Sequence, residues 1–278
     1  AQVVFATGGY GAVPALLGAR LAVACTLLYL PDIEPGLAVR AMGRLVDRVA
    51  VSFPEVRQRW QVDSMVVSGY PVRRGIGTMD KLQARGELNL ELKGKVLLVL
   101  GGSQGAHSIN VAISQALEEL LERCQIVHIS GPGDISWLRE RRVGLPEEVK
   151  RRYHLYTYLH GEMPQALAAA DLAVARAGAA VLGELPAAGL ASILVPYPYA
   201  GGHQRANAEF MVEKGAALMI EDQDLSQGEL LAQVICLLED DKAREKLASA
   251  ACGLARQQAA STDANEESHI RVLNELDR

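Results

Sequence analysis

The chain has 278 residues, of which 49% are hydrophobic and 22% are charged, and its formal net charge is −5 at pH 7. These values exclude a disordered chain and allow one large or two modest domains with apolar cores. Gly, Pro or charged residues interrupt the apolar runs well before the ~20 residues that a bilayer-spanning helix needs, so we expect no such helix.

Histidine and cysteine spacing predicts no metal site. The six histidines include no H-x-x-x-H or H-E-x-x-H pair. The four cysteines stand among apolar residues, and we expect reduced core side chains of a cytosolic protein: Cys25, Cys124, Cys236 and Cys252. The N-terminal third is weakly basic, which favours an anionic surface such as phospholipid headgroups but is too weak to predict nucleic-acid binding.

Strand and helix patterns alternate in the first third of the chain. We predict a buried strand at Gln2–Ala6 and an apolar helix from about Val13 to Leu21. The loop between them consists of Thr7, Gly8, Gly9 and Tyr10. Free N–H groups and the helix dipole at this point suit an anion. Further strands are predicted at Cys25–Leu30, Arg48–Phe53 and Ser64–Gly69.

A helix that begins at about Leu37 carries arginines at four-residue spacing, namely Arg40, Arg44 and Arg48. This stripe is either a solvated helix face or a contact with a lipid diphosphate or headgroups. The polar, aperiodic stretch that follows separates two domains. We predict an N-terminal domain at 1–80, a linker at 81–93 and a C-terminal domain at 94–258.

The stretch Lys95–Cys124 is the centre of the C-terminal domain. A buried strand, Lys95–Leu100, is followed by the loop GGSQGA and by an amphipathic helix that extends through Leu120. Ser103 and Gln104 add side-chain donors to a loop that suits a phosphate. The alternative is a tight connection that uses glycine for geometry alone; the spacing matches neither a Walker motif nor a dinucleotide fingerprint.

Strands and helices continue to alternate to Glu221, and the chain is helical from Leu225 onward. Strands are predicted at Gln125–Ser130, His154–Leu159, Leu172–Arg176, Ser192–Tyr197 and Ala216–Glu221. Helices are predicted at Met163–Ala170, Ala179–Ala188 and His203–Lys214. This pattern indicates parallel sheets covered on both faces, in two doubly wound α/β domains that face each other across a cleft.

A second stretch with candidate binding residues is Ala175–Asn207. Gly178 and Ala179 open a helix whose free N–H groups suit a diphosphate. Glu184 follows one and a half turns later and can accept both hydroxyls of a ribose, or it is an exposed helix residue. His203 and Gln204 open another helix, where they either bind sugar hydroxyls or cap the helix.

Six motifs in this order resemble the MurG family of peptidoglycan glycosyltransferases. They are TGGY at 7–10, RVAVSFPE at 48–55, GYPVR at 69–73, GGSQGA at 101–106, RAGA at 176–179 with Glu184, and GLASILVPYP with HQRANA at 189–208. The resemblance implies the GT-B fold, two Rossmann-like domains with the donor nucleotide in the second. It also implies an inverting transfer of GlcNAc from UDP-GlcNAc to undecaprenyl-diphosphate-MurNAc-pentapeptide at the cytoplasmic face of the plasma membrane, where the enzyme is peripheral.

The resemblance assigns roles to individual residues. Glu184 would hold the ribose hydroxyls, backbone near His160 would read the uracil, and Ser103, Gly178 and Ala179 would cradle the diphosphate. Gln104 joins them as a donor-loop residue, Arg73 would offset the diphosphate charge, and His203, Gln204 and Asn207 would contact GlcNAc. Gly8, Gly9 and Tyr10, with Thr7, resemble the loop that receives the acceptor diphosphate. No cofactor or metal is implied, and a last helix at 259–278 would pack on the first domain.

Departures from the family pattern lie on the acceptor side. The family begins with an earlier strand and a glycine-rich loop bearing a histidine proposed as general base, whereas this chain opens at Ala1 on a strand, so we expect an incomplete first domain and an unknown base. Tyr29, Leu30, Pro31 and Asp32 replace the usual His-Glu-Gln-Asn, and Tyr70 replaces an asparagine. These changes leave open a related enzyme with another acceptor, such as a glycolipid synthase or UDP-GlcNAc 2-epimerase, or a sugar-nucleotide-binding protein without turnover.

Overall fold

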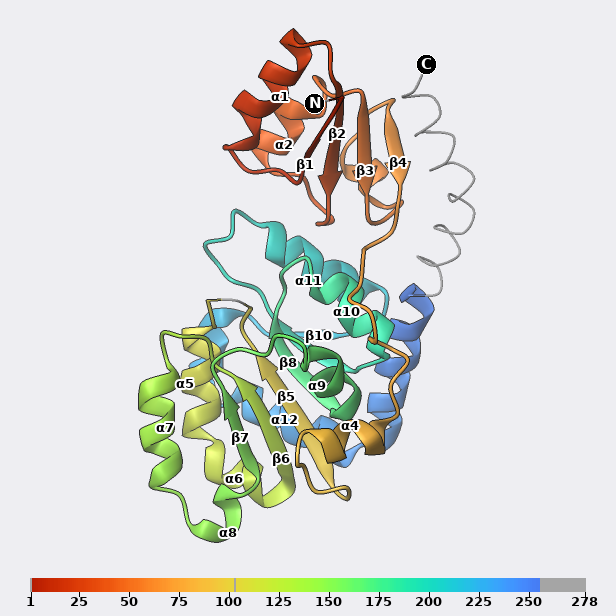
Figure 1. Ribbon diagram of the computed structural model, residues 1–278. Coiled ribbons are helices and arrows are strands. Elements are labelled where there is room, and N and C mark those ends of the chain that lie inside the picture. The colour runs from red at the N-terminus through yellow and green to blue at the C-terminus, as the bar shows by residue number, and fades with distance from the viewer. Residues whose placement is uncertain (1, 103, 256–278) are drawn as a thin grey trace.

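The protein, described by a computed structural model over residues 2–102 and 104–255, forms two α/β lobes (Figure 1). The first lobe is built on a four-stranded parallel sheet with the order β1-β2-β3-β4. Its strands are β1 (Val3–Ala6), β2 (Cys25–Leu30), β3 (Arg48–Val51) and β4 (Met65–Val67). The helices between them are α1 (Ala12–Leu21), α2 (Leu37–Met42) and α3 (Val56–Arg59).

The second lobe is built on a six-stranded parallel sheet with the order β10-β9-β8-β5-β6-β7. Its strands are β5 (Lys95–Leu100), β6 (Cys124–Ile129), β7 (Tyr153–Tyr156), β8 (Leu172–Arg176), β9 (Ser192–Val195) and β10 (Leu218–Met219). Its helices are α4 (Lys81–Glu87), α5 (His107–Gln115), α6 (Leu117–Arg123), α7 (Ile135–Val143), α8 (Glu147–Lys150), α9 (Met163–Ala169), α10 (Val181–Ala188), α11 (His203–Glu213) and α12 (Glu229–Glu239), with a 3-10 helix η1 (Asp222–Gln227). The expected fold, two doubly wound parallel sheets, is confirmed.

The central strands of the second sheet are buried because their sequences are nearly continuous aliphatic runs. Every residue of β6 and of β8 is buried. Helices on the two faces of the sheet pack into separate apolar clusters, one of which continues into the first lobe. The chain order reverses at β5, which lies between β6 and β8. Ligands of open parallel sheets bind beyond the carboxyl ends of the strands at such a reversal.

Apolar and charged contacts join the two lobes. The rings of Phe53, which follows β3, and Phe210 of α11 lie 5.0 Å apart between centroids, and both are buried in the shared cluster. The Nζ atom of Lys214 lies 2.6 Å from Oε1 of Glu55 across the same boundary. The carboxyl edge of the first sheet therefore rests on α11 of the second lobe (Figure 1).

The structure corrects two expectations about helices. The helix expected to run through Leu120 is two helices, α5 and α6, which meet at Ala116. The arginines at 40, 44 and 48 share no helix face, because α2 ends at Met42 and Arg48 lies in β3. The ring of Trp60 packs against Gly43, the residue that follows α2. A Cβ added to Gly43 would lie 2.1 Å from this ring, so only glycine allows the close packing.

Residues 81–93, expected to link the domains, contain helix α4. Asp80 caps this helix by accepting hydrogen bonds from the N–H groups of Leu82 and Gln83, both at 2.9 Å. Its buried Arg85 contacts the second lobe through Asp171 at 2.8 Å. We therefore propose that α4 belongs to the second lobe and that residues 68–79 make the crossing between lobes.

Two further expectations concern a C-terminal helix that packs on the first domain and the absence of a membrane-spanning helix. The helix expected at 259–278 lies outside the described residues. Among the residues that are described, no helix is both long enough and apolar enough to cross a bilayer.

Candidate functional site

The glycine loop after β5 lies at the reversal of strand order, as a phosphate loop would. Its glycines also have steric reasons for their positions. Gly105 has φ +83°, and a Cβ there would lie 2.2 Å from the carbonyl oxygen of Ser130. A Cβ on Gly101 would meet the backbone N of Ala106 at 2.2 Å. Glycine is therefore required for the close packing of this loop, whichever ligand it receives.

A hollow of about 660 Å³ opens beside this loop. The loop glycines and Ala106 line it together with the polar and aromatic residues Gln104, His107, Ser108, Arg176, Tyr197, Gln204 and Asp222. It thus brings together two predicted donor residues, Gln104 from the loop after β5 and Gln204 from α11. Gln204 is held in place because its Oε1 accepts a hydrogen bond from the backbone N–H of Tyr197 at 3.0 Å. Ser103 lies outside the described residues.

Arg176 is a residue of this hollow to which the sequence analysis gave no role. Its guanidinium lies 2.5 Å from Oδ1 of Asp222, donates to Oγ of Ser108 at 2.7 Å, and stacks over the ring of Tyr197 at 5.2 Å. Ser108 in turn donates to Asp222 at 2.6 Å. The available signal was a lone arginine that ends the buried apolar strand β8 immediately before the Ala-Gly-Ala turn.

Glu184 lies in α10 and is 8% exposed. Its Oε1 lies 3.1 Å from Nε of Arg73, which belongs to the crossing segment between the lobes. Burial raises the pKa of the Glu184 carboxyl, and the nearby Arg73 only partly counteracts that shift. The two predicted donor residues are thus in contact, but the arginine pairs with the predicted ribose ligand rather than with the glycine loop.

Tyr70 packs directly beside Glu184. A Cβ added to Gly183 would lie 2.2 Å from Cδ1 of the tyrosine ring, so the glycine makes room for it. Burial raises the pKa of Tyr70, and the charges of Glu184 and Asp32 add to that shift. Tyr70, which departs from the family motif, therefore packs against α10, the helix that carries the predicted ribose-binding residue Glu184.

The N-terminus of α10 lies next to the reversal point of the sheet. Gly178 and Ala179 precede this helix and follow β8. The N–H groups of Val181 and Leu182 already donate to the carbonyls of Gly178 and Ala179, both at 3.1 Å. An anion at this point would therefore meet the N–H groups of the turn itself, at 178–180, at the positive end of the helix dipole. His160 lies apart from this turn, beyond β7, where its N–H donates to Oε2 of Glu162 at 3.2 Å and its ring meets Tyr158 at 4.8 Å.

Asn207 and His203 of α11 contact the first lobe. Asn207 is fully buried: its Oδ1 accepts from the N–H of Ile33 at 3.0 Å, and its Nδ2 donates to Oδ1 of Asp32 at 2.8 Å and to the carbonyl of Ala177 at 3.0 Å. Nδ1 of His203 lies 3.1 Å from the carbonyl oxygen of Glu34. The contact of either side chain with GlcNAc therefore stays a prediction, since both are engaged between the lobes.

Asn207→Ala is expected to lower the free energy of unfolding by about 2–3 kcal/mol, because it leaves the buried N–H of Ile33 and carbonyl of Ala177 without partners. Urea unfolding measures the change. Arg205→Ala on the same helix removes only half-exposed ion pairs and should cost at most about 1 kcal/mol. Equal effects of the two substitutions would contradict the bridging role of Asn207.

A smaller hollow of about 240 Å³ lies between the lobes. The predicted acceptor loop lines it from the first lobe with Thr7, Gly8, Gly9 and Tyr10. His203 lines it from the second lobe. The two glycine loops that were predicted to hold diphosphates therefore open into separate hollows, and α11 contributes a residue to each.

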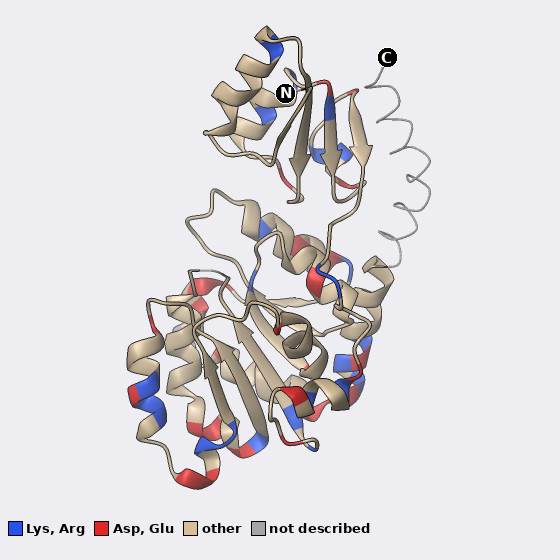
Figure 2. Cartoon of the chain, viewed as in Figure 1, with Lys and Arg blue, Asp and Glu red and all other residues tan. Residues whose placement is uncertain are grey.

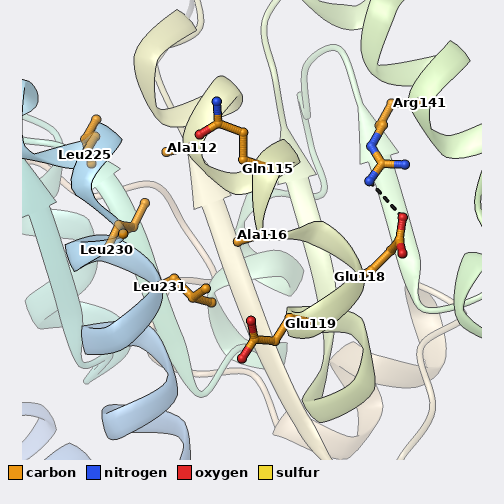
Figure 3. A pocket seen from close by; sticks show the side chains of 10 residues that line it. Ala112, Gln115, Ala116, Glu118, Glu119, Arg141, Leu225, Leu230 and Leu231 are labelled. Atoms are coloured by element: carbon orange, nitrogen blue, oxygen red, sulfur yellow. Dashed lines mark hydrogen bonds and ion pairs between the residues drawn. The ribbon is translucent and has the colours of Figure 1, made fainter.

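A third hollow, of about 400 Å³, lies away from these loops between α5, α6 and α12 (Figure 3). Leu225, Leu230 and Leu231 face Ala112 and Ala116 across it. Its charged rim is already engaged, since Arg141 donates to Oε1 of Glu118 at 2.9 Å. This hollow has no glycine loop at its wall, and we assign it no part in the site.

Comparison with known proteins identifies the family. Residues 96–267 match the glycosyltransferase family 28 C-terminal domain. An enzyme of Desulfitobacterium hafniense (strain Y51) is 38% identical over 263 residues, which cover 93% of this chain and 71% of that enzyme. It is named UDP-N-acetylglucosamine–N-acetylmuramyl-(pentapeptide) pyrophosphoryl-undecaprenol N-acetylglucosamine transferase. The chain belongs to the MurG family.

Another MurG relative of the same name, from Roseiflexus sp. (strain RS-1), is 39% identical over 294 residues. The chain spans about two thirds of the length of such relatives, 66% of the Roseiflexus protein and 63% of the one from Thermodesulfovibrio yellowstonii. The crystal structure of Acinetobacter baumannii MurG superimposes with a TM-score of 0.67 at 25% identity and covers 96% of this chain and 73% of that one. A Listeria monocytogenes protein described as a UDP-N-acetylglucosamine 2-epimerase shares the fold at 14% identity, with a TM-score of 0.66 and with 97% of this chain and 75% of that one covered.

Proposed function

We propose that the protein is an inverting glycosyltransferase that moves GlcNAc from UDP-GlcNAc to undecaprenyl-diphosphate-MurNAc-pentapeptide. The observation that carries the proposal is the 38% identity to an enzyme of that name over 93% of this chain. The two glycine loops at the carboxyl edges of facing sheets support it, because each is suited to one of the two diphosphates.

The reaction would be a single in-line displacement at the anomeric carbon of GlcNAc. A base removes the proton of the acceptor hydroxyl, the new C–O bond forms as the bond to the β-phosphate oxygen breaks, and UDP leaves with the bonding electron pair. The free N–H groups at the start of α5 and α10 would stabilise the charge that develops on UDP. The proposal requires no metal ion and leaves the base unidentified.

We assign the donor residues as follows. Glu184 would accept the ribose hydroxyls, and backbone near His160 would read the uracil. Gln104, Gly178 and Ala179, with Ser103, would surround the diphosphate. Arg73 would turn from Glu184 toward the diphosphate or share the carboxylate with the ribose, since the two groups are 3.1 Å apart before the donor binds. His203, Gln204 and Asn207 would face the GlcNAc once the lobes adjust.

A surface of the first lobe is suited to peripheral membrane contact. Its exposed apolar side chains are Leu17, Leu21, Val23 and Leu37. Helix α1 has no acidic residue in its first turn and ends with Arg20, and Figure 2 shows it almost without charge along its length. Apolar side chains beside an arginine bind anionic headgroups. We propose that this surface rests on the cytoplasmic face of the plasma membrane, next to the lipid acceptor.

A second candidate has the same donor but another acceptor. Asp32 favours it, because this residue departs from the family motif and its carboxylate is held by Asn207 at the wall of the presumed acceptor hollow. Tyr70 departs as well and packs against Gly183. Both changes alter the surface that an acceptor would meet.

Transfer of radiolabelled GlcNAc to a short-chain lipid I analogue tests the proposed function. We expect labelled disaccharide lipid, with inversion at the anomeric carbon. Labelling of a diacylglycerol acceptor instead would favour the second candidate, and conversion of UDP-GlcNAc to UDP-ManNAc without transfer would contradict the assignment as a transferase.

A further inference from the structure

His107 is a side chain of the donor hollow to which the proposed function gives no role. It is the first residue of α5, directly after the loop at 101–106. Its side chain is 74% exposed and lines the hollow together with Gln104 and Arg176. An imidazole at this position stands where a ligand of the loop would lie.

The ring of His107 is held in one orientation. Its Nδ1 lies 2.8 Å from Oδ1 of Asp134, and the ring of Trp137 lies edge-on at 6.4 Å between centroids. A carboxylate at this distance accepts a hydrogen bond from Nδ1–H, and a ring that also carries a proton on Nε2 can donate from that side as well. No described residue forms a hydrogen bond with Nε2 of His107, so this nitrogen remains available to a ligand in the hollow.

Asp134 is itself fixed by two further donors. Nε1 of Trp137 donates to its Oδ1 at 2.8 Å, and Nδ2 of Asn110 donates to its Oδ2 at 2.7 Å. Burial raises the pKa of Asp134, but the hydrogen bonds from Trp137, Asn110 and His107 outweigh it and hold the pKa below its ordinary value. Asp134 is therefore a carboxylate at neutral pH, and it is held in the position from which it orients the ring of His107.

The network continues inward but carries no further charge. Oδ1 of Asn110 lies 2.9 Å from Nε2 of His128, whose Nδ1 lies 2.8 Å from the hydroxyl of Tyr153. Burial lowers the pKa of His128 to about 3, so this ring is neutral. His128 therefore contributes no charge to the hollow.

Apart from Asp134, the charged side chains that line the hollow are engaged with each other. A positive side chain at a helix N-terminus is also opposed by the helix dipole. Arg176 and Asp222 on the opposite wall of the hollow are paired with each other at 2.5 Å. An anion in front of α5 would complete the arrangement, because the dipole, the loop N–H groups and an imidazolium all favour it.

We propose that His107, oriented by Asp134, is a further ligand of the donor diphosphate and binds a phosphate oxygen through Nε2–H. The inference rests on the proposed function, since the diphosphate is that of a uridine nucleotide. His107 acts here as a binding residue, and Asp134 as a residue that positions it.

The consequence is a contribution to affinity that is specific to phosphates. A hydrogen bond from Nε2–H of His107 would reach the diphosphate and not the nucleoside, so its loss should weaken the binding of UDP. Uridine, which lacks phosphate, should gain nothing from the residue at any pH.

Calorimetric titrations of UDP and uridine into the whole chain and into His107→Gln test the proposal. We expect His107→Gln to bind UDP about 3–10-fold more weakly, a modest effect because the ring is largely exposed. Uridine affinity should be unchanged. His107→Arg keeps a positive donor and should bind both UDP and uridine about as tightly as the unaltered chain does.

Each other outcome has a separate meaning. Equal losses of UDP and uridine affinity in His107→Gln, or an unchanged UDP affinity in that variant, would overturn the role of His107 while leaving the nucleotide site intact. Failure of the unaltered chain to bind UDP or uridine would overturn the proposed function and the inference with it. Matching urea unfolding midpoints of variant and parent exclude misfolding as the cause of a loss.

Discussion

Replacing Arg85 with alanine is expected to lower the free energy of unfolding by about 3–5 kcal/mol, because it removes the buried partner of the Asp171 carboxylate and leaves buried backbone carbonyls without a donor. Arg85 is 4% exposed, and its Nη2 lies 2.8 Å from Oδ2 of Asp171. The same oxygen accepts the N–H of Val96 at 2.7 Å, at the start of β5. Removal of the guanidinium therefore disturbs the edge from which the central strand begins.

The guanidinium also satisfies three backbone carbonyls. It donates to Ala169 at 3.1 Å, to Leu92 at 2.8 Å and to Gly94 at 3.1 Å. These bonds attach α4 and the segment after it to the second lobe. Urea unfolding measures the effect, and Lys81→Ala is the matched control: Lys81 also pairs with Asp171, at 2.7 Å, but is 45% exposed and should contribute at most about 1 kcal/mol. Similar losses in the two variants would contradict this account.

Glu184→Ala is expected to weaken binding of UDP-GlcNAc about 10–100-fold, equivalent to ~1.4–2.8 kcal/mol. The reason is that an ionised carboxylate can accept both ribose hydroxyls in charge-assisted hydrogen bonds. Calorimetry measures the affinity. Glu118→Ala, on the rim of the remote hollow of Figure 3, is the matched control and should bind normally. Unchanged affinity in Glu184→Ala would remove the ribose assignment.

The same assignment predicts a dependence on pH with a definite sign. Burial raises the pKa of Glu184, with Arg73 opposing the shift, so the carboxyl takes up its proton at a higher pH than an ordinary glutamate. The protonated form accepts hydroxyl protons poorly, so uridine affinity should fall as the pH falls. Calorimetric titration with uridine at several pH values measures this sign for the ribose site, because uridine carries no phosphate.

The alternating pattern of the sequence was sufficient to predict the two parallel sheets. Continuous aliphatic runs such as Lys95–Leu100 and Leu172–Arg176 mark strands buried on both faces, and their bounds match β5 and β8. The helix break at Ala116 left no comparable signal, since alanine favours helix continuation. Helix α4 was not predicted, because the polar residues around Arg85 favour a linker and its contact with Asp171 is made through that single charged residue.

The glycine loops of the candidate site could be predicted because local sequence determines them. The contacts between its distant side chains could not, because tertiary structure determines those. Gly101 and Gly105 identify their loop in the sequence because only glycine fits at these two positions. The pairing of Arg73 with Glu184 and the bridging of Asn207 to Asp32 join residues more than a hundred positions apart, and spacing along the chain carries no trace of them. His107 and Asp134 likewise meet only because α5 and α7 begin at the same edge of the sheet.

The central claim is that the second lobe holds a uridine-diphosphate sugar between its glycine loop and α10. Calorimetric titration of the chain with UDP-GlcNAc, UDP-glucose and UDP tests it most directly. The account predicts binding of all three, with UDP-GlcNAc preferred over UDP-glucose. A folded chain that binds none of them, or that binds UDP-glucose as tightly as UDP-GlcNAc, would contradict it.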